Sequence, residues 1–126
     1  MNMNLKYGMD EAPFSPSTPT DSLLFVSGQG AIDPLTGKIA ADGLESQTSM
    51  TIRNVEDILS QSGLTLHDVV KVNIYLKNRA DYETFNRVYA RLFPQPYPAR
   101  TLVYCDLNFD LLVEIDVVAR LRSSSE

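Results

Sequence analysis

Arg100 is the residue of this chain best placed to bind a small anion. It is the only charged residue in the run Phe93-Pro94-Gln95-Pro96-Tyr97-Pro98-Ala99-Arg100-Thr101. The three prolines stiffen the approach, because each fixes its own φ and biases the preceding residue towards extended structure. The residues that follow, Thr101–Cys105, are typical of a β-strand. A guanidinium at the start of a rigid strand suits a planar carboxylate, which it can hold through two parallel hydrogen bonds.

Glu114 is the carboxylate that could complement Arg100. It lies near the start of the next predicted strand, after the connection Asp106–Asp110. If these two strands are antiparallel neighbours, a hairpin returns Glu114 towards Tyr104 and Cys105. A neighbouring chain or a twist of the sheet would then have to complete a pocket with Arg100. The residues alone favour the simpler interpretation, a solvated surface pair that contributes little stability.

The segment Gly28-Gln29-Gly30 follows a predicted strand, which is one feature of phosphate-binding loops. The full GxGxxG and GxxxxGK patterns are missing, and the next residues lead into a turn rather than a helix. The residues alone therefore favour a strand end at which glycine permits an unusual backbone angle. Glycine would also let backbone N–H groups approach a ligand.

The chain offers little for nucleophilic triads or metal sites. His67 is its only histidine and Cys105 its only cysteine, and they lie far apart in the sequence. Dedicated metal sites need clustered histidine, cysteine and carboxylate ligands, and we expect none here. We interpret His67 as a surface or boundary residue.

Composition indicates one soluble domain spanning residues 1–126. The hydrophobic content of 44% is ordinary for a globular protein, and the formal net charge of −5 argues against unspecific binding to nucleic acid or anionic membranes. A single cysteine excludes an intrachain disulfide and fits a reducing compartment. We see no signal peptide and no apolar run of the ~18 residues that a membrane span needs. We therefore expect a cytoplasmic protein, with a disordered tail at Ser123–Glu126.

The spacing of apolar residues predicts an α+β domain. Helical periodicity covers Gly43–Gln61 and Asp81–Leu92, whereas alternation or compact apolar runs predict strands. The expected strands are Leu5–Tyr7, Ser22–Ser27, Val69–Lys77, Thr101–Cys105 and Leu111–Leu121, with an extended edge segment at Pro13–Pro19. This order predicts a mixed sheet with both helices stacked on one face.

Several short motifs, taken together and in order, give the chain a family resemblance from Pro13 to Leu121. They are Pro13-Phe14-Ser15, Val26-Ser27-Gly28-Gln29, Asp33-Pro34-Leu35-Thr36-Gly37, Asn54-Val55, Val70-Lys71-Val72, Phe85-Asn86 with Tyr89, Pro98-Ala99-Arg100-Thr101 and Val113-Glu114-Ile115. Each motif is weak alone. At this spacing they resemble the Rid family of enamine/imine deaminases, also called the YjgF or liver perchloric-acid-soluble protein family.

The resemblance implies a chorismate-mutase-like α+β fold and a homotrimer. Three sheets would pack into a barrel with the helices outside, and the ligand clefts would lie between subunits. The implied reaction is the hydrolysis of reactive 2-enamine or 2-imine acids, such as 2-aminoacrylate, to 2-keto acids and ammonia. The implied partners are the small carboxylate-bearing ligand and the other subunits, and no cofactor is required.

The resemblance also assigns roles to particular residues. Arg100 would clamp the substrate carboxylate, and Glu114 would deprotonate the attacking water and help protonate the departing ammonia. Backbone groups at Gly28 and Leu102 would line the pocket, and Asn86 would reach it. Thr101, next to the arginine, belongs to the same substrate-binding motif.

Two positions depart from the pattern of many deaminase-active members. Phe14 stands where many have tyrosine, and Leu102 stands where many have cysteine. The implied mechanism does not need that cysteine as a nucleophile, because Leu102 has the same backbone carbonyl. The hydroxyl lost at Phe14 is expected either to shift substrate preference towards more apolar imines or to lower activity.

Two other functions compete with the deaminase interpretation. One is a non-catalytic module that senses small carboxylates such as 2-ketobutyrate through Arg100, without turnover. The other is a ribonuclease, an activity attached to some family members by name. The acidic balance, the lone histidine and the absence of an aromatic-basic stripe argue against the ribonuclease.

Overall fold

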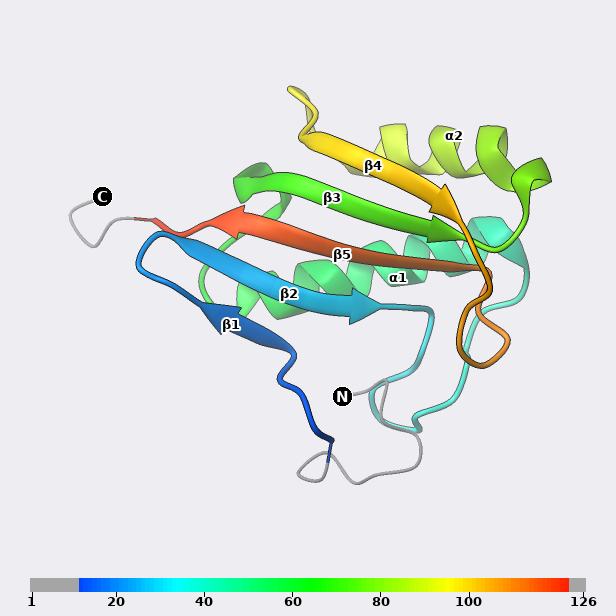
Figure 1. Ribbon diagram of the computed structural model, residues 1–126, viewed down its shortest axis with the longest axis horizontal. Coiled ribbons are helices and arrows are strands. Elements are labelled where there is room, and N and C mark those ends of the chain that lie inside the picture. The colour runs from blue at the N-terminus through cyan, green and yellow to red at the C-terminus, as the bar shows by residue number, and fades with distance from the viewer. Residues whose placement is uncertain (1–11, 123–126) are drawn as a thin grey trace.

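The computed structural model describes residues 12–122 and places them in a five-stranded sheet covered by two long helices (Figure 1). The strands are β1 Ser17–Pro19, β2 Leu23–Gln29, β3 Val69–Leu76, β4 Ala99–Tyr104 and β5 Val113–Arg120. The helices are α1 Gly43–Ser60 and α2 Tyr82–Leu92, and short 3-10 helices lie at Leu66–Asp68 and Arg79–Asp81. The predicted α+β class is confirmed. None of the helices in this described part is long and apolar enough to cross a membrane.

Most of the predicted elements are present close to their predicted bounds. Both predicted helices form, and the segments predicted at 69–77 and 111–121 contain β3 and β5. The segments predicted at 22–27 and 101–105 overlap β2, which ends two residues later than predicted, and β4, which begins two residues earlier. The extended segment Pro13–Pro19 contains β1, which lies at one edge of the sheet. The strand predicted at Leu5–Tyr7 and the disordered tail predicted at Ser123–Glu126 lie outside the described residues.

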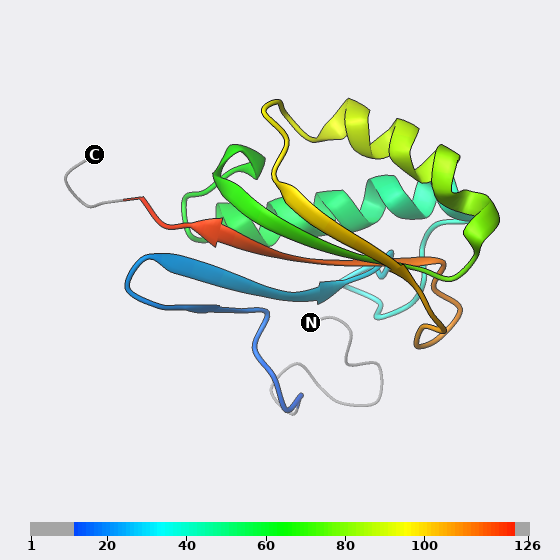
Figure 2. The ribbon, with the colours of Figure 1, turned by 45° about the horizontal axis from the view of Figure 1, so that its top comes forward.

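The strand order is β1-β2-β5-β3-β4. Strands β3 and β4 are parallel, so the chain must cross over between them, and α2 makes that crossing. The other paired strands are antiparallel. Figures 1 and 2 show both helices on the same face of the sheet, as the sequence predicts. Strand β3 separates β4 from β5, so these two strands do not form the hairpin considered from the sequence.

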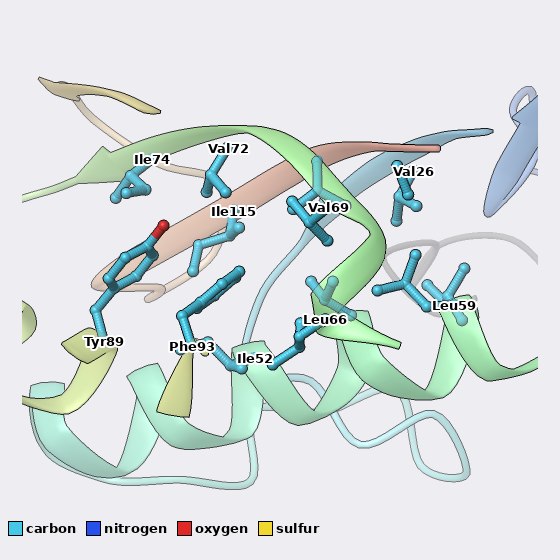
Figure 3. Close-up of a cluster of buried hydrophobic side chains, with 14 of the residues drawn as sticks. Val26, Ile52, Leu59, Leu66, Val69, Val72, Ile74, Tyr89, Phe93 and Ile115 are labelled. Atoms are coloured by element: carbon cyan, nitrogen blue, oxygen red, sulfur yellow. The ribbon is translucent and has the colours of Figure 1, made fainter. Parts of the chain in front are cut away.

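The core lies between the sheet and the helices. Alternate residues of β3 and β5 are buried, as period-2 patterning requires of a sheet covered on one face. They meet the apolar stripe of α1 and the aromatic side chains of α2 (Figure 3). The largest fully buried side chains of the core include Ile52, Leu59, Ile74, Phe85 and Ile115. Truncating a buried leucine or isoleucine of this kind to alanine costs roughly 2–5 kcal/mol of unfolding free energy.

The other face of the sheet is not covered by any described helix (Figure 2). Asp116 organises its centre, because its carboxylate accepts hydrogen bonds from Asn73 Nδ2 and from the Tyr75 hydroxyl, both at 2.9 Å. The hydrogen bond to Asp116, followed by burial, raises the pKa of Tyr75 to about 12. Phe25 and Val103 pair with residues of this face and remain 46% and 43% exposed. They lie on β2 and β4, which β5 and β3 separate, so they are two single exposed apolar side chains and not one patch.

Candidate active site

Arg100 is the second residue of β4, and its side chain lies on the helix-covered face. Its partner on β3 is the core residue Val72, and directly paired residues share a face. Arg100 Nη2 donates a hydrogen bond to Asn86 Oδ1 of α2 at 2.6 Å. The guanidinium carbon lies 5.0 Å from the ring centre of Tyr89 and 5.8 Å from that of Phe85, within range of cation–π attraction. These contacts fix the position of the guanidinium. Because it has five N–H donors, donors remain available for a substrate carboxylate after the bond to Asn86.

A cavity of about 330 Å³ opens beside this guanidinium. We call it the arginine cleft; it is lined by Asn86, Tyr89, Ala90, Tyr97, Pro98 and Arg100. Among residues 12–122, Arg100 is the only charged residue in this lining, and the walls are otherwise mostly carbon. A carboxylate that enters the cleft would therefore meet a cation in a poorly hydrated setting, where charge-assisted hydrogen bonds are strong.

Glu114 lies in a second cavity, of about 250 Å³. We call it the glutamate cleft; it is lined by Phe14, Ser27, Gly28, Asn108 and Glu114. A Cβ atom at Gly28 would overlap Glu114 Oε2 and lie 3.0 Å from its Cδ, so only glycine leaves room for the carboxylate in this position. Burial, and then the negative charge of Asp116, raise the pKa of Glu114. A carboxyl with a raised pKa is suited to exchanging protons near neutral pH.

The two clefts open on opposite faces of the sheet. Glu114 pairs with Tyr75 and alternates with buried residues of β5, so its side chain lies on the face away from the helices. Arg100 lies on the helix side, and β3 runs between the two strands. One chain therefore does not bring Arg100 and Glu114 together, and the predicted site residues divide into two groups.

The remaining predicted residues can be assigned to these groups. Asn86 lies with Arg100, whereas Phe14 and Gly28 lie with Glu114. Thr101 lies on the opposite face from Arg100, and its hydroxyl accepts a hydrogen bond from Lys71 Nζ at 2.8 Å. The side chain of Leu102 packs against the hydrophobic core. Neither Thr101 nor Leu102 lines either cleft.

Three tyrosines were not singled out as binding residues from the sequence: two that line the arginine cleft and one a helical turn from Asn86. Tyr97 lies in the proline-rich run before Arg100, and this position is the signal that could have identified it. Tyr89 belongs to the family motif with Phe85-Asn86, and its ring forms a wall of the cleft. Tyr82 lies one helical turn before Asn86. A hydrogen bond with Asn86 and the positive charge of Arg100 lower the pKa of this exposed phenol, which is not part of the cleft lining.

Two polar side chains of α1 hold the strand ends that form the glutamate cleft. Asn54 Nδ2 donates to Gly30 O at 2.9 Å and to Ile32 O at 3.0 Å, immediately after β2. The buried Gln47 Oε1 accepts a hydrogen bond from the backbone N–H of Leu112 at 2.8 Å, just before β5. These bonds satisfy backbone groups that the sheet leaves unpaired, and they fix the segments next to Gly28 and Glu114.

The raised pKa of Glu114 predicts how stability depends on pH. The folded chain holds the Glu114 proton more tightly than the unfolded chain, so the free energy of unfolding falls as pH rises through this pKa. Glu114→Gln removes that ionisation. We expect the variant to gain stability relative to the parent at pH 8 and to lose this gain at pH 4, measured by urea denaturation. Glu56→Gln, which changes an exposed carboxylate of α1, is the control. An equal difference in unfolding free energy between variant and parent at pH 8 and at pH 4 would contradict the raised pKa of Glu114.

Comparison with solved structures identifies the class of fold. The five-stranded mixed sheet with two helices on one face is the fold of the Rid and L-PSP proteins. The crystal structure of RidA from a Psychrobacter species superposes with a TM-score of 0.83 and 29% identity, and the match covers 87% of this chain and 89% of that one.

Sequence comparison then identifies the family. The family model described as endoribonuclease L-PSP matches residues 9–121. A RutC family protein of Pyrococcus horikoshii is 39% identical over 85% of this chain and 86% of its own length. The 3-aminoacrylate deaminase RutC of Acinetobacter baylyi is 36% identical over 87% of this chain and 88% of its own length. The chain belongs to the endoribonuclease L-PSP (Rid) family, which confirms the predicted resemblance.

Proposed function

We propose that this protein hydrolyses 2-imino acids, and the 2-enamine acids that tautomerise to them, to 2-keto acids and ammonia. The observation that carries the proposal is the arginine cleft, in which a positioned guanidinium is the only charged wall of a small apolar cavity. Such a site selects a small carboxylate. A relative named as a 3-aminoacrylate deaminase supports hydrolysis of small enamine carboxylates, although the amino group of that compound lies on C3 and not on C2.

The chemistry requires a carboxylate clamp and one proton carrier. Arg100 would hold the substrate carboxylate, which positions the adjacent imine carbon. A water oxygen adds to that carbon while Glu114 accepts a water proton and passes it to the nitrogen. In the resulting carbinolamine the carbon–nitrogen bond breaks, the hydroxyl proton moves through Glu114 to the leaving ammonia, and the carbonyl forms. The raised pKa of Glu114 favours both directions of this transfer.

We propose that the two groups of site residues meet between copies of the chain, in a homotrimer. Arg100 and Glu114 lie on opposite faces of one sheet, so Glu114 of a neighbouring copy would face Arg100. Phe25 and Val103, both exposed on the bare face of the sheet, would be available for contacts with neighbouring copies. No cofactor takes part in this mechanism. We also propose a cytoplasmic location, because the single cysteine fits a reducing compartment.

A coupled assay tests the proposal. An amino-acid oxidase generates a 2-imino acid, and the rate of keto-acid formation is measured with and without this protein. We expect a clear acceleration that is proportional to protein concentration, with heat-denatured protein as the control. Failure to accelerate hydrolysis of any imine in a panel of aliphatic and aromatic amino acids would overturn the proposed function.

Gly28→Ala tests whether the position of the Glu114 carboxylate matters for this reaction. The added methyl group would overlap Glu114 Oε2, so the carboxylate must move. We expect kcat/KM to fall about tenfold to hundredfold, since a displacement near 1 Å can cost this much. The melting temperature should change little, because the displaced oxygen is the end of a flexible side chain. In a Glu114→Ala background the same glycine change should cause no further loss, and an equal loss there would contradict this explanation.

A non-catalytic carboxylate-binding protein is the second candidate. It is favoured by one observation: the arginine cleft is complete in one chain, without Glu114. This alternative predicts saturable binding of a 2-keto acid that needs Arg100, no acceleration of imine hydrolysis, and unchanged binding in Glu114→Ala. Calorimetry with 2-ketobutyrate, combined with the coupled assay, separates the two functions.

A further inference from the structure

The walls of the arginine cleft are almost entirely apolar beyond its polar end. Arg100 and Asn86 supply that end, and the Asn86 Oδ1 atom is already bonded to the guanidinium. The remaining lining residues are Tyr89, Ala90, Tyr97 and Pro98. None of them carries a charge, so the cleft offers little to a substrate side chain that ends in a charged group.

The two tyrosines present their rings to the cleft while their hydroxyls are directed elsewhere. The Tyr97 hydroxyl donates to Ala90 O at 3.4 Å and accepts from Gln95 Nε2 at 3.2 Å. The Tyr89 hydroxyl is directed towards the sheet (Figure 3), where it is buried without a partner among residues 12–122. Burial is also the main reason why the pKa of Tyr89 is raised to about 12.

The Tyr89 ring is a rigid wall. It stacks on Phe93 with ring centres 4.4 Å apart and planes inclined by 18°, and the Tyr97 ring centre lies 6.5 Å away. Packed aromatic rings of this kind change position little on binding, so the cleft keeps its width. A pre-formed apolar wall favours a ligand with matching apolar surface.

The volume of the cleft also favours a ligand with a large apolar side chain. Its volume is about 330 Å³, whereas a water molecule takes up about 30 Å³ of the liquid. An acid whose side chain is a methyl or methylene group would leave much of this space to water against aromatic walls. Replacing that water by a larger apolar side chain is favourable, because apolar surface on both sides leaves the solvent.

We propose that the arginine cleft selects 2-imino and 2-keto acids with bulky apolar side chains, of the isobutyl or benzyl kind, over those with methyl or hydroxymethyl side chains. For imines this selection rests on the proposed function. Ala90 is the specificity-determining residue, because its small side chain leaves the wall of the cleft open at an exposed helix position. In the proposed assembly Phe14 of a neighbouring copy would arrive with Glu114 and add another apolar wall.

The coupled assay with imines from leucine, phenylalanine and alanine tests the selection. We expect kcat/KM for the leucine and phenylalanine imines to exceed that for the alanine imine by about tenfold or more, since each extra methylene in an apolar pocket gives roughly 10–200-fold. Ala90→Leu should lower kcat/KM for the two larger imines by a factor at least about tenfold greater than the factor for the alanine imine. Arg91→Leu, which adds the same side chain at an exposed α2 position outside the lining of the arginine cleft, is the matched control and should behave like the parent.

Binding of the product acids provides a readout that does not need turnover. Calorimetry should give tighter binding for 4-methyl-2-oxopentanoate and phenylpyruvate than for pyruvate, and Ala90→Leu should abolish the difference. Equal or weaker binding of the larger acids would overturn the selection even if imines are hydrolysed. Selective binding without hydrolysis of any imine would instead overturn the proposed function and leave the selection for keto acids standing.

Discussion

Replacing Arg100 with alanine should lower kcat/KM for imine hydrolysis by at least about hundredfold, because a charge-assisted, bidentate grip on the substrate carboxylate is lost. The lost interaction also orients the imine carbon, so the fall should appear in kcat as well as in KM. The measurement is the coupled assay with a leucine-derived imine over a range of concentrations. Calorimetry should show a parallel loss of 2-keto-acid binding.

Two further variants make this result specific to the guanidinium. Arg100→Lys keeps the charge but not the planar fork of donors, so an intermediate loss of about tenfold is expected. Arg91→Ala removes an exposed arginine from the last turn of α2, outside the arginine cleft, and should leave the rate unchanged. Thermal unfolding of Arg100→Ala must show a folded protein, because the side chain also contacts Tyr89 and Phe85. Undiminished hydrolysis by folded Arg100→Ala would overturn the role given to this residue.

Much of the fold could be predicted because local patterns decide it. The alternation in β3 and β5 shows which side chains face the core, and the helical spacing in α1 shows which stripe meets the sheet. Turn and strand-end glycines mark the limits of these elements; Gly63, for example, adopts a φ of 73° just after α1. These signals depend on residues close together in the chain.

The order of the strands could not be predicted in the same way. Thr101–Cys105 and Leu111–Leu121 are consecutive in the chain, and a hairpin was the simplest way to connect them. The structure places β3 between β4 and β5 and makes β4 parallel to β3. This choice depends on how α2 packs across the sheet, which is a contact between distant segments that no local pattern encodes.

Contacts between distant segments also limit what the sequence can predict about the candidate site. Alternation around Glu114 places it away from the core, but the face occupied by Arg100 follows only from its pairing with Val72. Residue type and position singled out Arg100 and Glu114, and the family resemblance assigned their roles, whereas the local pattern could not show on which face of the sheet each would lie. The division into two clefts therefore changes the question from how the pair is built to which copy supplies each member.

Mixing two inactive variants addresses that question directly. Arg100→Ala keeps a functional glutamate cleft and Glu114→Ala keeps a functional arginine cleft, so each alone should be nearly inactive. When the two chains are co-expressed with different tags, a mixed ring contains some interfaces where an intact Arg100 meets an intact Glu114 of the neighbour. With random assembly about one quarter of the interfaces are of this kind, so about one quarter of the parent activity should return.

A double variant separates this arrangement from a site within one chain. Arg100→Ala/Glu114→Ala co-assembled at equal amounts with the parent chain should retain about one quarter of the activity per interface if the residues act between copies. It should retain about one half if they act within one chain, because half the chains are then intact. Mass spectrometry of the tagged assemblies establishes that mixing has occurred. Absence of recovered activity in verified mixtures of the two single variants would exclude the intersubunit site, since each single variant carries the residue that the other lacks.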